Sequence, residues 1–113
     1  LTLLCTPGND VESTTAMAGA GANLMLFSTG LGTPTGNPIV PTLKVATNSQ
    51  LAKRMTDIID FDAGAVIRGE ATIAEVGEKL LELALQTASG EYSPCAVRLA
   101  QDDFLPWKRG VSL

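Results

Sequence analysis

Apolar residues along this chain fall into short continuous runs, separated by loops rich in glycine, threonine and asparagine. The runs at residues 1–5 (LTLLC) and 23–28 (NLMLFS) are continuous rather than alternating in polarity. Such runs are typical of strands that are covered on both faces of a parallel sheet. A third strand is predicted at 42–46 and a fourth at 65–67. The pattern therefore indicates about four short strands.

Three segments carry helical signals. The clearest is residues 72–88, where Ile73, Val76 and Leu80 recur at helical spacing opposite a charged face. Thr72 and Glu75 form the T-x-x-E capping box that begins a helix. Shorter helices are predicted at 11–22 and 50–55; the first is rich in alanine and glycine, which would let its backbone approach a neighbouring strand closely.

Strands and helices alternate along the chain, which favours right-handed crossovers and a parallel sheet with helices on both faces. The predicted fold class is α/β: a small three-layer Rossmann-like domain with a mostly parallel sheet of about four strands. The alternation does not define the strand order.

The 113 residues fit a single domain. After Pro94 no clear periodicity remains, so residues 90–113 are predicted to be an irregular tail. We expect Phe104 and Trp107 to fasten this tail onto the body of the domain or onto another domain. Because Leu1 is not a methionine and the chain opens within a predicted strand, we expect this domain to be the tail portion of a longer protein.

Composition narrows the possible functions. The net charge is −4 and the basic residues are dispersed, so a nucleic-acid or anionic-membrane partner is not expected. No apolar run approaches the roughly 20 residues of a membrane-spanning helix. The absence of histidine excludes Ser-His and Cys-His nucleophile pairs and imidazole metal ligation within this chain. Cys5 and Cys95 are interpreted as two reduced thiols of a cytosolic protein.

Hydroxyl, amide and backbone N–H groups gather in two loops that each follow a predicted strand. Open α/β sheets bind ligands beyond the carboxyl ends of their strands, and the first loop also leads into a helix N-terminus, which attracts anions. A carboxylate bearing several hydroxyls, such as a sugar acid, matches these donors. The same residues also suit strand ends and helix caps, so a purely structural role stays open. The candidates are Thr6, Gly8, Asn9, Ser13, Thr14, Thr29, Gly30, Gly32 and Thr33.

Two further groups of charged residues invite a functional interpretation. Lys44 lies close to the end of the third predicted strand, and a buried lysine can act as a base; a solvated lysine is the alternative. Asp57, Asp60 and Asp62 precede the fourth predicted strand, and carboxylates can hold a hard divalent metal. Their spacing matches no established ligand pattern, so surface or capping roles are expected for them.

Three longer phrases carry a family resemblance: TPGND at 6–10, STGLGTPTGNP at 28–38 and LKVATNS at 43–49. They resemble the C-terminal region of the altronate dehydratase family, which includes galactarate dehydratase, and the resemblance covers nearly the whole chain. It implies a cytoplasmic hydro-lyase of hexuronate or hexarate catabolism, which removes water from a sugar acid to give a 2-keto-3-deoxy acid. The residues of these phrases resemble the altronate branch of the family more closely than the galactarate branch.

The resemblance also implies a cofactor and partners. Family proteins use a divalent iron or manganese ion and are several times longer than this chain, so the metal ligands are expected mainly upstream of it, and no residue here is assigned to the metal. The implied partners are the sugar-acid substrate and upstream domains of the same polypeptide, and a homo-oligomer is compatible with this arrangement. The alternative is a non-catalytic module for small-molecule binding or oligomerisation.

Residue roles follow from positions within the three phrases. The resemblance implies that the two loops line one substrate pocket and that Lys44 is either an electrostatic clamp or a proton-transfer group. The implied substrate-binding residues are Thr6, Gly8, Asn9, Asp10, Thr29, Gly30, Gly32, Thr33 and Asn48.

Overall fold

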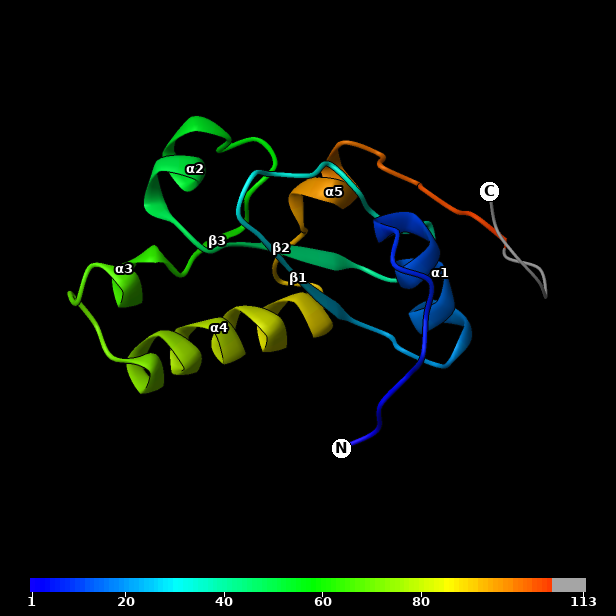
Figure 1. The fold of residues 1–113 in the computed structure, drawn as a ribbon, viewed down its shortest axis with the longest axis horizontal. Helices are drawn as coiled ribbons and strands as arrows, with labels where there is room; N and C mark the ends of the chain where they lie inside the picture. Colours follow the sequence, from blue (N-terminus) through cyan, green and yellow to red (C-terminus); the bar gives the residue numbers. More distant parts are fainter. Residues whose placement is uncertain (107–113) are drawn as a thin grey trace.

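The chain folds around a three-stranded, all-parallel sheet in the order β1-β2-β3 (Figure 1). This computed structural model describes residues 1–106. The strands are β1 (Met25–Thr29), β2 (Thr42–Ala46) and β3 (Phe61–Asp62). Met25 pairs with Thr42 and Thr29 with Ala46 along the whole length of β1 and β2. All five residues of the central strand β2 are buried.

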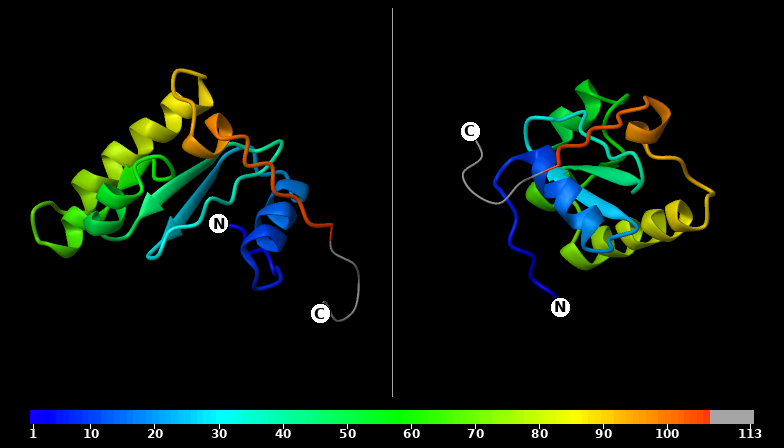
Figure 2. Two further views of the ribbon diagram at one scale, coloured as in Figure 1. Left: turned by 90° about the horizontal axis from the view of Figure 1, so that it is seen from above. Right: turned by 90° about the vertical axis from the view of Figure 1, so that its right-hand side faces the viewer.

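Helices lie on both faces of this sheet, which confirms the α/β class. They are α1 (Asp10–Gly19), α2 (Ser49–Arg54), α3 (Gly64–Ile67), α4 (Ile73–Ala88) and α5 (Cys95–Arg98). Helix α4 runs along one face, α2 and α5 lie on the other, and α1 lies beside the amino ends of the strands (Figures 1 and 2). Among residues 1–106, no helix is long and apolar enough to cross a membrane.

The elements with strong local signals form as predicted. Strand β2 spans the predicted residues, and β1 lies within two residues of its prediction. The capping box of α4 is complete: Glu75 N donates to Thr72 Oγ1 at 3.2 Å, and Thr72 N donates to Glu75 Oε2 at 2.8 Å. Because the two hydrogen bonds of the capping box join residues three apart, this cap forms without help from tertiary contacts.

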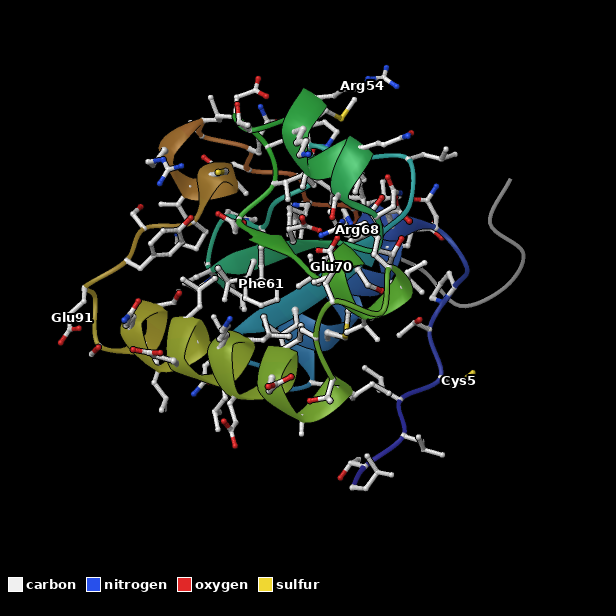
Figure 3. The ribbon with its side chains drawn as sticks, turned by 90° about the vertical axis from the view of Figure 1, so that its left-hand side faces the viewer. Cys5, Arg54, Phe61, Arg68, Glu70 and Glu91 are labelled. Carbon is white, nitrogen blue, oxygen red and sulfur yellow. The ribbon has the colours of Figure 1, made fainter. Side chains whose placement is uncertain are left out.

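The first predicted strand is wrong. Residues 1–5 have no regular secondary structure and are exposed, and Cys5 lies on an extended segment that projects away from the sheet (Figure 3). A continuous apolar run becomes a strand only when another strand supplies its hydrogen bonds. In the part of the chain that the structure describes, these residues have no such neighbour.

The fourth predicted strand is also wrong, because residues 65–67 belong to α3. The third strand of the sheet lies earlier, at Phe61–Asp62. Asp62 Oδ1 accepts a hydrogen bond from Gly64 N at 2.8 Å, which turns the chain out of the sheet and into the helix. A run of three apolar residues fits a strand or a helix equally well, so its periodicity could not decide between them.

The carboxyl-terminal segment is more ordered than the predicted irregular tail. It contains α5, whose residues Cys95 and Ala96 are buried. Further on, Leu105 N donates to Thr15 Oγ1 at 3.1 Å, which fastens the segment onto α1. Phe104 lines a hollow of about 420 Å³ beside α1. The predicted anchor Trp107 lies outside the described residues.

Candidate functional site

The first candidate loop forms the amino-terminal cap of α1. Asn9 Oδ1 accepts a hydrogen bond from Val11 N at 3.1 Å. Ser13 Oγ donates to the carbonyl oxygen of Pro7 at 2.6 Å and lies 3.0 Å from Thr6 Oγ1. Most of the predicted donors of this loop therefore already have partners within the loop and the first turn of the helix.

The second candidate loop lies at the carboxyl end of β1. Thr29 Oγ1 accepts from Gly32 N at 2.9 Å, and Gly32 has a φ of +93°, a backbone conformation that glycine adopts without strain. Asn48 Nδ2 donates to the carbonyl oxygen of Gly30 at 3.1 Å. Thr29, Gly30, Gly32 and Asn48 are thus brought together at one edge of the sheet. Thr33 lies further along and hydrogen-bonds through its hydroxyl to Thr35 at 2.9 Å.

The structure does not bring the two loops to one edge. The second loop follows the carboxyl end of β1, whereas α1 lies beside the amino ends of the strands (Figures 1 and 2). The predicted shared edge assumed that residues 1–5 form a neighbouring strand, and they do not. Thr6, Gly8, Asn9 and Asp10 therefore stand apart from Thr29, Gly30 and Gly32 in this fold.

Lys44 is the largest fully buried side chain of the described chain, with no exposed surface. Its ammonium nitrogen Nζ has no hydrogen-bond partner among residues 1–106 and lies 5.5 Å from the centroid of the Phe27 ring. A cation within about 6 Å of a ring face is attracted by the π electrons, but this contact replaces no hydrogen bond. An unpartnered buried amine is costly to keep, so it marks this position as a candidate for function.

Charges around Lys44 oppose the effect of its burial. Burial lowers the pKa of the Lys44 ammonium below 10.5, while Asp60, Asp103, the Cys95 thiol and Asp10 act in the opposite direction. The acidic groups come from α1, from the segment before β3 and from the carboxyl-terminal segment. The ammonium group of Lys44 is therefore influenced by acidic groups from three segments that are far apart in the sequence.

Asp60 holds the backbone around Lys44 in place. Asp60 Oδ2 accepts from Lys44 N at 2.7 Å, and Asp60 Oδ1 accepts from Cys95 N at 2.7 Å and from the Tyr92 hydroxyl at 2.9 Å. Sequence reasoning gave Asp60 only a surface or capping role. The partners are separated from it by 16, 35 and 32 residues, so no local signal could have revealed this cluster.

The connection from β1 to β2, residues 30–41, passes on the side of the sheet where α2 and α5 lie (Figure 1). Gly36 N donates to Asp103 Oδ2 at 3.3 Å. A side chain at Gly36 would meet the backbone of Gln101, so glycine is required there. Asn37 Oδ1 accepts from Val40 N at 3.1 Å, while its buried Nδ2 has no hydrogen-bond partner within residues 1–106. The connection is therefore fastened at its centre to the carboxyl-terminal segment.

The described residues do not form a metal site by themselves. Over residues 1–106, no group of three or more acidic, cysteine or histidine residues is placed to hold a metal ion. Asp60 accepts from three donors, and Asp62 accepts from Gly64 N at the start of α3. Two of the three aspartates that were considered as ligands thus have structural partners.

Comparison with known proteins places these features in a family context. Residues 1–112 match the family described as D-galactarate/Altronate dehydratase, C-terminal. The chain is 44% identical over all 113 residues to altronate dehydratase of Escherichia coli K12, and these cover 22% of that protein. It is 43% identical over 86 residues, 76% of the chain and 16% of the relative, to galactarate dehydratase (L-threo-forming) of the same organism.

A third relative carries a different name. The chain is 38% identical over 82 residues to the (2R)-sulfolactate sulfo-lyase subunit beta of Chromohalobacter salexigens, which covers 73% of the chain and 21% of that protein. The chain thus spans about a fifth of the length of the curated relatives that it matches.

Proposed function

Because the chain belongs to the galactarate/altronate dehydratase family, we propose that it is the C-terminal domain of a sugar-acid dehydratase. The full polypeptide would convert altronate, or galactarate, to a 2-keto-3-deoxy sugar acid with loss of water. The observation that carries this proposal is the match over residues 1–112, together with 44% identity to an altronate dehydratase. On its own, the domain is expected to be inactive, since it spans 22% of that relative.

The names of the three relatives point to the chemical group that the domain would recognise. Altronate, galactarate and sulfolactate are all 2-hydroxy carboxylates, whereas the group lost is water in two cases and sulfite in the third. A domain common to all three would therefore act on the shared hydroxycarboxylate end. The choice of leaving group would then depend on the rest of the polypeptide.

Lys44 is the residue of this domain that we assign to the reaction. Elimination requires a base to remove the proton α to the carboxylate, after which negative charge develops on the enediolate while the β-hydroxyl leaves. A buried, unpartnered amine is suited to either of two roles here. As an ammonium it would stabilise the enediolate, and as a neutral amine with a lowered pKa it would accept the proton.

Substrate can reach Lys44 only if its cover moves, because the side chain has no exposed surface. We assign this movement to the irregular connection 30–41, because lids of active sites are commonly such segments. In this proposal Thr29, Gly30, Gly32, Thr33 and Asn48 contact the substrate hydroxyls when the connection shifts. The first loop would contact substrate only in the full-length polypeptide, where other domains complete the pocket; its residues are Thr6, Gly8, Asn9 and Asp10.

The metal remains an expectation from the family resemblance. A divalent iron or manganese ion would stabilise the developing charge in the full-length enzyme, with ligands supplied mainly by the rest of the polypeptide. No step of the proposal passes through a metal ligand of this chain.

The test is an assay of the full-length polypeptide that contains this domain, supplied with iron or manganese. We expect it to form a 2-keto-3-deoxy acid from altronate, or from galactarate, detected as a new keto acid. Sulfolactate serves as the comparison substrate, with release of sulfite as its readout. If no hydroxy acid is turned over while these ligands still bind, the domain is the binding module of the alternative interpretation.

A further inference from the structure

The outer edge of β1 is open. Met25 N donates to the carbonyl of Pro41, and the carbonyl of Thr29 accepts from Thr47 N, so the backbone groups of these residues point toward β2. Alternation along a strand turns the N–H and C=O groups of Leu26 and Ser28 the other way. Within the part of the chain that the structure describes, β1 has β2 as its sole strand neighbour. These groups therefore form a free template for another strand.

Apolar surface accompanies this edge on one face of the sheet. Leu26 pairs in register with Leu43, on the face opposite Lys44 and Phe27. Leu43 is fully buried, whereas Leu26, its partner on the same face, is 53% exposed. The β1 side of this face is therefore less covered than its centre.

Helix α4 also carries an uncovered apolar flank. Val76 and Thr87 are its buried residues, whereas Ile73, Leu81 and Leu85 are 78%, 60% and 62% exposed. Ile73 and Leu81 lie about 80° apart around the helix, and Leu85 lies about 40° further on, beside Glu78 and Glu82. The charged residues Glu75, Glu78, Lys79 and Glu82 line a polar hollow with Glu70 on the side of the helix away from Ile73. Ile73 and Leu81 therefore form the apolar flank of α4, and Leu85 borders the charged surface.

We propose that a β-strand from the part of the polypeptide that precedes this domain pairs with the open edge of β1. Apolar side chains of that strand and its connection would cover Leu26 and the apolar flank of α4. Parallel sheets are normally buried on both faces and extend beyond three strands. This proposal rests on family membership and not on the proposed activity.

The lengths of the relatives indicate where the strand that pairs with β1 would come from. The family match describes a C-terminal region, and about four fifths of the length of the relatives lies outside the matched part. A strand tethered in the same polypeptide has a high effective concentration at β1, which a second copy of the chain lacks. The alternative occupant, β1 of a second copy, would be recognised by its dependence on concentration.

The test is hydrogen exchange with single-residue resolution on the full-length polypeptide. We expect the amides of Leu26 and Ser28 to exchange at least ~100-fold more slowly than unprotected amides, to the same extent at all protein concentrations. Exchange at the unprotected rate would overturn the proposal. Protection that disappears on dilution would overturn it as well, in favour of a second copy.

A matched pair of variants on α4 tests the apolar cover. Leu81→Lys should raise the exchange rate at Leu26 and Ser28 at least ~10-fold, whereas Glu82→Lys, on the charged side of the same helix, should leave it unchanged. Equal effects of the two variants would contradict the cover. Since exchange is measured without substrate, a failure here is distinct from a failure of the dehydratase assay.

Discussion

The backbone N–H of Lys44 donates to the carboxylate of Asp60 at 2.7 Å, while the ammonium group of the same lysine is buried without a hydrogen-bond partner in the described chain. One end of the residue is firmly held and the other end is left unsatisfied. Such an arrangement is expected where a charged group is kept for function at the expense of stability. Substitutions at the ammonium group and at Asp60 should therefore change the stability of the fold in opposite directions.

Replacing the ammonium end should stabilise the fold. Lys44→Met keeps an unbranched side chain, one atom shorter, and removes the buried charge, so we expect the free energy of unfolding at pH 7 to rise by about 1 kcal/mol or more. Urea unfolding of the full-length protein measures this. A loss of stability would mean that the ammonium is satisfied in the folded protein after all.

The same pair of proteins should differ in the pH dependence of stability. The folded state lowers the pKa of Lys44, so between that pKa and 10.5 the unfolded chain binds more protons than the folded one. The stability of the wild type should therefore rise with pH through this window relative to Lys44→Met, and level off above it. A constant difference at all pH values would contradict the lowered pKa.

Replacing the Asp60 end should destabilise the fold. Both carboxylate oxygens of Asp60 accept hydrogen bonds: Oδ2 from the Lys44 backbone, and Oδ1 from the Cys95 backbone and the Tyr92 hydroxyl. Asp60→Asn puts an amide donor in place of one of these oxygens, so we expect a loss of about 2 kcal/mol or more. Tyr92→Phe removes a single hydrogen bond and should cost about 1 kcal/mol. Chemical denaturation compares the two, and equal small losses would exclude Asp60 as the centre of this cluster.

Tyr92 is the only tyrosine of the 113 residues. In the ultraviolet absorbance spectrum of this domain, the phenolate signal therefore reports on Tyr92 alone. Burial and the neighbouring Asp60 carboxylate raise its pKa to about 12. The ultraviolet absorbance of the phenolate should thus appear about two pH units later in the folded than in the denatured chain. Because the folded state holds the proton more tightly, this group should make stability fall as pH rises from about 10 to 12.

The sequence was most informative where structure depends on near neighbours. The Thr72–Glu75 cap of α4 forms as predicted because it needs only residues three apart. The run of β2 also forms as predicted, because β1 and β3 are available on either side to pair with it. Residues 1–5 and 65–67 carry equally apolar runs but form no strands, because strand pairing is decided by partners elsewhere.

Within the candidate site, the sequence singled out Lys44 together with Thr29, Gly30 and Asn48, and the fold brings Gly30 and Asn48 into contact; their functional roles stay predictions. The sequence could not identify the role of Asp60, which depends on Tyr92 and Cys95 more than 30 residues away. The complete burial of Lys44 was equally invisible, because burial depends on tertiary packing.

The most direct test of the central claim is the turnover number of the full-length enzyme carrying Lys44→Met, measured with altronate and galactarate beside Lys44→Arg. We predict that Lys44→Met lowers kcat at least ~100-fold while the protein stays folded. Partial recovery in Lys44→Arg would indicate an electrostatic clamp, and equal loss in both variants a proton-transfer group. A folded Lys44→Met enzyme with near-wild-type kcat would contradict the account.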